Sequence, residues 1–401
     1  MLLIERFTIY FTMQFSSRLQ PLSRNVFADM DRAKGDAIRN GKQLIDLSLG
    51  SSDLPVSPDI LEKSSEALQD PSTHGYLLFN ETVDFRKAIA QWYEKRFGIA
   101  VDPDHEVLPL IGSQEGTAHL PLAILNPGDY ALLQDPGYPS HAGGVYLANG
   151  QMHLMPLTAD NQFLPDFGAI PTDILSQSKL MVLSYPHNPT TAVALLAFFE
   201  EAVSFCKQHG IVLVHDFPYV DFVFSGETPP SVLQADRDRS CSIEFFTLSK
   251  SYNMGGFRIG YAIGNRDLIQ ALKRIKAIVD FNQYRGILRA ASYALSQGME
   301  AVQPTIDTFK ERQQFFHQAL QKMGWNVPKP EATMYIWAPL PLSWANQSLD
   351  FSQKLVAQTG VALSPGAGFG PQGDNYVRFA LVHDLPKLQE AVDRIGTFLH
   401  T

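Results

Sequence analysis

Short apolar runs alternate with helical stretches through the middle of the chain. Each run ends in a turn or a polar cluster, as at Asp135-Pro136-Gly137. The predicted strands are Val107 to Ile111, Tyr130 to Leu133, Leu180 to Ser184, Ile211 to Val214, Phe245 to Leu248 and Ile259 to Ile263. Helices are predicted between them at 117–125 and 194–208. Strands that alternate with helices favour a mostly parallel sheet covered by helices on both faces, an α/β fold.

This alternation stops toward both ends of the chain. Glu311 to Met323 has the spacing of an amphipathic helix, and short strands and proline-rich loops follow it. Leu355 to Thr359 and Leu388 to Leu399 are again predicted helices. A length of 401 residues suits two or three domains. We expect residues 61–290 to form a large domain and 291–401 a small C-terminal one, with 1–60 as an N-terminal extension and part of the small domain.

Composition excludes several partners and locations. Acidic residues outnumber basic ones by 41 to 32, which argues against binding to nucleic acid. No uncharged run approaches the ~20 residues of a membrane span. Two cysteines, Cys206 and Cys241, suit a reducing cytoplasm. Glu5 and Arg6 interrupt the apolar N-terminus, so we expect either an extension or a true start at Met13 rather than a secretory signal.

Polar residues follow the predicted strands at the edge where open α/β sheets bind ligands. Ser113 and Gln114 open a helix after the first strand, and a helix N-terminus can bind phosphate. Thr247, Ser249 and Arg258 can add hydroxyls and a guanidinium to the same anion. Taken alone, each has an ordinary structural interpretation: the serine as a helix cap and the Asn188-Pro189 pair as a turn.

Three further strand-end residues complete a set of chemical roles. Tyr138 offers an aromatic face for stacking, and Asp216 ends a buried strand, where a carboxylate needs a cation or strong donor. Lys250 supplies an amine, although a single lysine is usually a surface charge. A phosphate cup, a carboxylate for a ring nitrogen and an amine for an aldehyde together predict pyridoxal 5'-phosphate (PLP) as the cofactor.

Residues 247–260, Thr-Leu-Ser-Lys-Ser-Tyr-Asn-Met-Gly-Gly-Phe-Arg-Ile-Gly, resemble the lysine signature of the class I/II PLP-dependent aminotransferases of fold type I. The resemblance runs from about Asp46 to near the C-terminus. Within the family, the chain is most similar to the bacterial and archaeal LL-diaminopimelate-, aspartate- or alanine-type group. The resemblance implies a mostly parallel seven-stranded sheet in a large domain and a smaller α+β domain.

The family resemblance also implies a role for each strand-end residue. Lys250 would bond to the cofactor aldehyde and later move the substrate proton, while Asp216 pairs with the protonated ring nitrogen. Asn188 and Tyr219 would hold the ring oxygen, and Tyr138 would stack on the ring. The implied phosphate ligands are Ser113, Gln114, Thr247, Ser249 and Arg258.

On the substrate side, the resemblance implies that Arg378 binds the α-carboxylate, with Asn188 beside it and Gly50 allowing close backbone approach. Tyr76 would reach the phosphate of a neighbouring subunit, which implies a homodimer with shared sites. The expected activity is ping-pong transfer of an amino group between an L-amino acid and a 2-oxo acid. Arg285 and an aromatic group made of Tyr284, Phe79 and Phe281 are further candidates for the substrate pocket, with surface or interface packing as the alternative.

Two segments depart from the family pattern. Relatives usually have Asn at the position of His187 and Gly at that of Thr191. In Phe281 to Gly286, a segment that tends to line the pocket from the partner subunit, Phe281 and Asn282 stand where relatives often show Ser-Gly. Because these positions border the substrate, the amino donor stays open between the three types.

Specific features bear on the other functions open to such a chain. The same residues could support β-elimination, as in a PLP-dependent C–S β-lyase, or decarboxylation by another PLP enzyme of the same fold. An effector-binding module of a transcription regulator would need a basic DNA-binding domain, for which this acidic chain leaves no room. Gly366 to Pro371 lacks the last glycine of a dinucleotide-binding loop. The chain has no His-Glu-x-x-His or Cys-x-x-Cys motif, so we expect no metal and assign His119 and His215 to packing.

Overall fold

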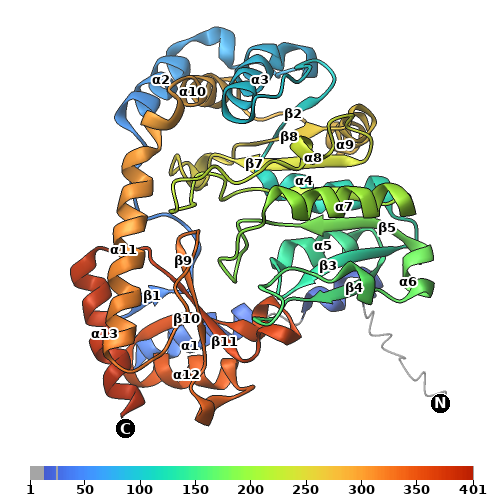
Figure 1. Ribbon diagram of the computed structural model, residues 1–401. Coiled ribbons are helices and arrows are strands. Elements are labelled where there is room, and N and C mark those ends of the chain that lie inside the picture. Colours follow the sequence, from blue (N-terminus) through green and yellow to red (C-terminus); the bar gives the residue numbers. More distant parts are fainter. Residues whose placement is uncertain (1–12, 24–25, 401) are drawn as a thin grey trace, which may run out of the picture.

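A seven-stranded sheet forms the centre of the computed structural model, which describes residues 13–23 and 26–400 (Figure 1). The predicted choice between an extension and a start at Met13 falls mainly on residues outside this range. The strands lie in the order β2-β8-β7-β6-β5-β3-β4, and β8 alone runs antiparallel to its neighbours. Their bounds are β2 (Val107–Leu110), β3 (Tyr130–Asp135), β4 (Gln151–Pro156), β5 (Ser178–Leu183), β6 (Val212–Asp216), β7 (Ser242–Thr247) and β8 (Gly260–Gly264). The predicted α/β fold with a mostly parallel sheet is confirmed.

Strand β4 was not predicted, although it completes the expected seven. It lies at the sheet edge, pairs only with β3 within the described sheet, and buries only Met155 fully. An edge strand exposed on one side lacks the continuous apolar run that marks buried strands. All six predicted strands are present, but their ends are shifted. For example, β7 begins at Ser242, and β6 extends to Asp216.

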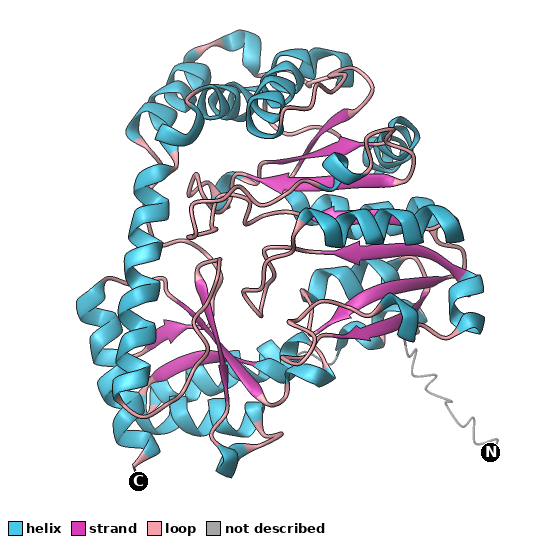
Figure 2. Cartoon of the chain, in the orientation of Figure 1, coloured by secondary structure: helices cyan, strands magenta, loops and turns pink. Residues whose placement is uncertain are grey.

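Helices cover both faces of this sheet, as Figure 2 shows. On one face lie α4 (Ser113–Ile124), α5 (Pro139–Leu147) and α9 (Arg266–Val279). Successive residues of β3 point to opposite faces: Leu132 belongs to one hydrophobic cluster, and Leu133 to the other. On the second face, α7 (Leu196–His209) packs with Phe198 and Phe199. The helix predicted at 117–125 corresponds to α4, which begins four residues earlier than predicted, at Ser113.

Two helices were predicted too short because buried polar residues interrupt their apolar pattern. Helix α11 (Gln303–Lys322) begins eight residues before the predicted Glu311. The missed part contains the buried polar residue Thr305, whose hydroxyl oxygen accepts a hydrogen bond from Asn253 Nδ2 over 2.9 Å. Helix α12 (Ser348–Thr359) likewise contains the buried polar residue Ser352, and was predicted only from residue 355.

A second sheet joins segments from opposite ends of the chain. Its order is β1-β10-β11-β9, with β1 parallel to β10 and the other pairs antiparallel. The bounds are β1 (Ile45–Leu47), β9 (Tyr335–Pro339), β10 (Val361–Pro365) and β11 (Tyr376–Ala380). Helices α1 (Val26–Arg39), α12 and α13 (Leu385–Leu399) pack against this sheet. Part of residues 1–60 thus joins the C-terminal region, while the predicted domain limits 1–60, 61–290 and 291–401 stay predictions.

The remaining helices form a group beyond β2. They are α2 (Pro58–Gln69), α3 (Val83–Phe97) and α10 (Arg285–Ser296), and α11 runs from this group to the second sheet (Figure 1). Two short helices, α6 (Thr172–Gln177) and α8 (Val232–Ala235), complete the set of described α-helices. Among the residues that the structure describes, no helix is both long and apolar enough to cross a membrane.

Candidate active site

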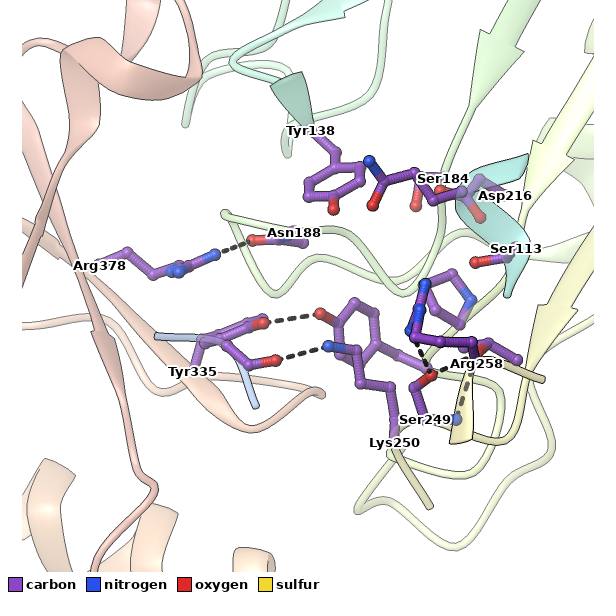
Figure 3. Close-up of a pocket in the computed structure, with 15 residues that line it drawn as sticks. Ser113, Tyr138, Ser184, Asn188, Asp216, Ser249, Lys250, Arg258, Tyr335 and Arg378 are labelled. Atoms are coloured by element: carbon purple, nitrogen blue, oxygen red, sulfur yellow. Dashed lines mark hydrogen bonds between the residues drawn. The ribbon is translucent and has the colours of Figure 1, made fainter. Parts of the chain in front are cut away.

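A cavity of about 210 Å³ lies where the carboxyl ends of β5, β6 and β7 face the second sheet. Twelve of the residues predicted to bind cofactor or substrate line it: Gly50, Ser113, Gln114, Tyr138, Asn188, Asp216, Tyr219, Thr247, Ser249, Lys250, Arg258 and Arg378. The predicted Tyr76 does not, nor do the further pocket candidates Phe79, Phe281, Tyr284 and Arg285. Ser184, Pro218 and Tyr335 also line the cavity and were not predicted as site residues. Figure 3 shows these side chains directed toward a common space.

One end of the cavity has the features of an anion site. Ser113 and Gln114 open helix α4, so backbone N–H groups and the positive end of the helix dipole face the space. A Cβ at Gly112 would lie 2.5 Å from Arg258 Nη2, so only glycine lets the guanidinium approach this turn. Thr247 Oγ1 donates to Ser249 Oγ over 2.8 Å. These donors suit a phosphate group.

The carboxylate of Asp216 is buried and only half satisfied. Asp216 ends β6 and is 4% exposed. Its Oδ2 lies 2.9 Å from His141 Nε2, whereas Oδ1 has no hydrogen-bond partner among the described residues. A buried, unpartnered carboxylate oxygen costs free energy unless a donor meets it, and a protonated pyridine nitrogen is such a donor. The residues present therefore fit PLP.

Lys250 enters the same cavity from the loop after β7. Its Nζ donates to the Gly50 carbonyl oxygen over 2.5 Å and lies 5.7 Å from the centre of the Tyr219 ring. Lys250 follows β7 of the large sheet, and Gly50 follows β1 of the second sheet. Their hydrogen bond therefore links the two sheets. A half-buried amine that is held by one carbonyl oxygen can leave it to attack an incoming carbonyl carbon.

Arg378 is held between two rings at the opposite side of the cavity. It lies on β11, with its guanidinium 4.2 Å from the centre of the Tyr335 ring and 4.7 Å from that of Phe369. Its Nη1 donates to Asn188 Oδ1 over 2.7 Å, and its Nη2 donates to the Ser48 carbonyl over 2.9 Å. Nε is buried and has no partner among the described residues, so the group keeps a donor for a carboxylate.

The loop that carries Asn188 contains both departures from the family pattern, His187 and Thr191. His187 is fully buried, and its Nδ1 lies 2.8 Å from Thr190 Oγ1. Burial lowers the His187 pKa to about 3, so its ring is neutral at physiological pH. Thr191 adopts a φ of 68°, the left-handed conformation that a glycine would adopt without strain. Asn188 still lines the cavity.

The Phe281 to Gly286 segment does not line the cavity of its own chain. Phe281 packs edge-on against Phe79, with 5.1 Å between ring centres. The Tyr284 hydroxyl donates to the Ala67 carbonyl over 2.9 Å, and Arg285 pairs with Glu81 at 2.9 Å. Tyr76 is 91% exposed and also lies outside the cavity. Its predicted role concerns a second subunit and stays a prediction.

Sequence reasoning missed His141 and Tyr335. His141 lies on α5, three residues after Tyr138, so one helical turn places both beside Asp216. That spacing was a usable signal. Tyr335 lies on β9 of the second sheet, and a tyrosine in a buried strand is usually core packing. The sequence predicts Ser184 as the last residue of a strand, whereas β5 ends at Leu183 and Ser184 faces the cavity.

Three side chains near the anion site, Glu115, His119 and Asp280, have the spacing of metal ligands. Ligand atoms of Glu115, His119 and Asp280 lie within 4.8 Å of one another. However, Lys276 Nζ lies 2.9 Å from Glu115 Oε1 and 3.2 Å from Asp280 Oδ1. The ammonium group supplies the positive charge that these carboxylates require, and burial lowers the His119 pKa, so the ring is kept neutral.

Comparison with curated proteins finds long matches. The LL-diaminopimelate aminotransferase of Dehalococcoides mccartyi is 40% identical over 386 residues, which cover 96% of this chain and 99% of that protein. The LL-diaminopimelate aminotransferase of Aquifex aeolicus is 38% identical over 382 residues, covering 95% and 98% of the two chains.

Comparison with solved structures gives the same fold over the same length. Substrate-bound BacF from Bacillus subtilis has a TM-score of 0.92 at 36% identity and covers 96% of this chain and 98% of its own. The probable N-succinyldiaminopimelate aminotransferase from Thermus thermophilus has a TM-score of 0.88 at 44% identity, covering 93% and 99%. Residues 42–395 match the family described as Aminotransferase class I and II. The chain therefore belongs to the class I and II aminotransferase family.

Proposed function

We propose that this protein is a PLP-dependent aminotransferase that moves an amino group between an L-amino acid and a 2-oxo acid. The observation that carries the proposal is that one cavity is lined by the Lys250 amine and by the unpartnered Oδ1 of Asp216. These two groups match the aldehyde and the ring nitrogen of one cofactor. The family match over residues 42–395 supports the same activity.

The cavity offers a binding partner for each part of the cofactor. The turn at Ser113 and Gln114, with Arg258 and the two hydroxyls of Thr247 and Ser249, would bind the phosphate. Tyr138 would stack on the ring, and Asn188 and Tyr219 would hold its oxygen. When bound, PLP withdraws electrons from the bond to the substrate α-carbon that is being broken.

The chain's own residues would then control the substrate. Arg378 binds the α-carboxylate with the donors that face the cavity, and Gly50 leaves room for the backbone approach. Asp216 keeps the ring nitrogen protonated by ionic pairing. The Lys250 amine removes the proton from the substrate α-carbon as a general base. A second substrate, a 2-oxo acid, takes the amino group in the return half of the cycle, which gives ping-pong kinetics.

LL-diaminopimelate is the amino donor that we propose. The support is that curated LL-diaminopimelate aminotransferases match 95–96% of this chain at 38–40% identity. A probable N-succinyldiaminopimelate aminotransferase matches at 44% identity. The C–S β-lyase alternative is not favoured, because these relatives are named as aminotransferases over nearly their whole length. The same relatives argue against an effector-binding module.

We further propose a homodimer in which each subunit completes its partner's site. The Tyr76 side chain is 91% exposed, which leaves it accessible to a second subunit, as the family resemblance implies. A cytoplasmic location is proposed from the low cysteine content, and both cysteines are free thiols.

A donor screen tests the proposed function. Purified protein loaded with PLP is incubated with LL-diaminopimelate, aspartate or alanine, each with 2-oxoglutarate, and glutamate formation is measured. We expect LL-diaminopimelate to give the highest kcat/KM. Release of pyruvate and ammonia from a sulfur amino acid without any acceptor would instead support the β-lyase. If glutamate forms with aspartate or alanine but not with LL-diaminopimelate, the proposed donor is wrong, while the proposed aminotransferase activity is still supported.

A further inference from the structure

Tyr335 contacts functional groups on both sides of the cavity, yet neither the sequence motifs nor the family signature assigned it a role. It lies on β9 of the second sheet and is 1% exposed. Its hydroxyl lies 2.7 Å from the hydroxyl of Tyr219, which belongs to the loop after β6 of the large sheet. This contact therefore joins segments that follow or belong to the two sheets, and Tyr335 is labelled in Figure 3.

The Tyr335 ring is fixed in place by close packing. It meets the Tyr219 ring edge-on, with 5.6 Å between centres and 73° between planes. Phe222, Phe309 and Met334 surround the pair in one buried cluster. A Cβ at Gly50 would lie 2.1 Å from the Tyr335 hydroxyl oxygen, so this hydroxyl needs glycine at that position. The hydroxyl therefore has little freedom to move.

The opposite side of the same ring supports the carboxylate site. The guanidinium of Arg378 lies over the ring, 4.2 Å from its centre. This is the distance of a cation–π contact, which fixes the plane of the guanidinium. Tyr335 thus touches Tyr219 with its oxygen and Arg378 with its ring.

Either hydroxyl of this pair can donate to the other, since each O–H can donate and each oxygen can accept. Burial raises the pKa of Tyr335, but the positive charges of Lys250 and Arg378 and the hydrogen bond with Tyr219 outweigh it, so the net pKa is lowered. Burial raises the pKa of Tyr219 well above its usual value. When Tyr219 donates its own proton to the ring oxygen of the cofactor, the Tyr335 O–H is the donor that fits the Tyr219 oxygen. Lys250, Arg378 and Tyr138 are titratable groups that face this pair.

We propose that Tyr335 is a positioning residue for the transfer reaction. Its hydroxyl orients Tyr219 toward the ring oxygen of the cofactor, and its ring orients Arg378 toward the substrate carboxylate. The inference rests on the proposed function, because both orientations matter only when PLP and an amino acid bind. It predicts two separable effects, one for the hydroxyl and one for the ring.

The hydroxyl is tested by the visible absorption of the PLP-loaded enzyme as a function of pH. Donation from Tyr219 to the ring oxygen favours the deprotonated chromophore, so losing that orientation raises the pH midpoint. We expect Tyr335→Phe to raise the midpoint by about 0.5 to 1 pH unit, the size of one hydrogen bond. Tyr376→Phe is the matched control, since Tyr376 lies outside the cavity on neighbouring β11 and should leave the midpoint unchanged.

A double-variant cycle shows whether Tyr335 acts through Tyr219. Tyr219→Phe alone should raise the midpoint, and adding Tyr335→Phe should raise it no further. Additive shifts in the double variant would overturn the proposed coupling, and so would an unchanged midpoint in Tyr335→Phe. Gly50→Ala gives a second probe, since its methyl group would displace the Tyr335 hydroxyl and should raise the midpoint as well.

The ring is tested by comparing KM with kcat. Tyr335→Phe keeps the ring, so KM for the 2-oxo acid should stay within about twofold while kcat falls. Tyr335→Leu removes the ring, and KM should rise by about three- to thirtyfold, the range of a cation–π contact. Equal KM values in both variants would overturn the ring's role. If the wild-type protein gains no visible absorption with PLP, the proposed function itself fails. If the wild type absorbs normally but the variants change neither the pH midpoint nor KM, only the role of Tyr335 fails.

Discussion

His141 binds one oxygen of the Asp216 carboxylate and leaves the other directed at the cavity. Nε2 of His141 lies 2.9 Å from Oδ2 of Asp216, and both side chains are buried. Because the histidine fixes the carboxylate plane, Oδ1 is held ready for a donor before any ligand arrives. This preorganisation is the physical reason to expect a strong dependence on Asp216.

Asp216→Ala should bind PLP weakly and lose at least about a thousandfold in kcat, because removal of the charge lets the ring nitrogen lose its proton. PLP affinity is measured by absorbance titration, and kcat by the donor assay. His141→Asn should lower kcat less, since it keeps the carboxylate. Near-normal turnover in Asp216→Ala would refute the assignment of this residue.

Arg378→Lys should raise KM for amino and 2-oxo acids and lower kcat/KM by roughly 30- to 150-fold. A lysine cannot form the two parallel hydrogen bonds of a guanidinium or stack in the same way, a loss of about 2 to 3 kcal/mol. Steady-state kinetics with a 2-oxo acid measure the change. Arg266→Lys serves as the control, since Arg266 lies on the surface beside Asp102. A wild-type KM in Arg378→Lys would remove this residue from the carboxylate site.

Lys276→Met should destabilise the fold by about 3 to 5 kcal/mol, because it leaves the buried Glu115 carboxylate without its cation. Burial already raises the Glu115 pKa to about 7 despite that cation. The double variant Glu115→Gln/Lys276→Met should recover much of the loss. Urea unfolding of the wild type, the single variants Lys276→Met and Glu115→Gln, and the double variant measures it. If the double variant is as unstable as the sum of both single variants, the ion pair is not the source of the effect.

Asp135→Asn should stabilise the protein at alkaline pH and have little effect at acid pH. Burial raises the Asp135 pKa from 3.8 to about 6, although the Gln372 backbone N–H donates to the carboxylate over 3.2 Å. While the Asp135 carboxyl is protonated in both the folded and the unfolded state, its raised pKa does not change the free energy of unfolding. The raised pKa then lowers the free energy of unfolding increasingly from pH about 4 to about 6, and this destabilisation remains at higher pH.

A shift of this size corresponds to at most about 3 kcal/mol at pH 8. Melting temperatures of wild type and Asp135→Asn are compared at pH 4.5 and pH 8, where other titrations cancel in the difference. The variant should gain clearly more stability relative to wild type at pH 8 than at pH 4.5. The same difference at both pH values would argue against a raised pKa for Asp135.

The site could be predicted from sequence wherever neighbouring strands of the large sheet bring residues together. Asp216 and Lys250 follow β6 and β7, which are adjacent and parallel, so their carboxyl ends meet at one edge. The turn at Ser113 follows β2 on the same side of the sheet, through its pairing with β8. Simple periodicity of apolar runs was sufficient for these placements.

The parts that could not be predicted depend on contacts between distant segments. Tyr335 reaches the cavity only because the second sheet packs beside the first, an arrangement that no local pattern encodes. Strand β4 is an exposed edge strand, whose pairing with β3 supplies what its own composition lacks. The early start of α11 was hidden by the polar residue Thr305, which is buried in the fold and hydrogen-bonded to the distant Asn253.

The central claim is that the amine of Lys250 captures the aldehyde of PLP. Purified protein is incubated with PLP, reduced with borohydride, digested and mapped by mass spectrometry, with Lys250→Ala as the control. We predict a yellow protein and a reduced adduct on Lys250 alone, absent from the variant. A protein that stays colourless in excess PLP, or an adduct on another lysine, would contradict the account.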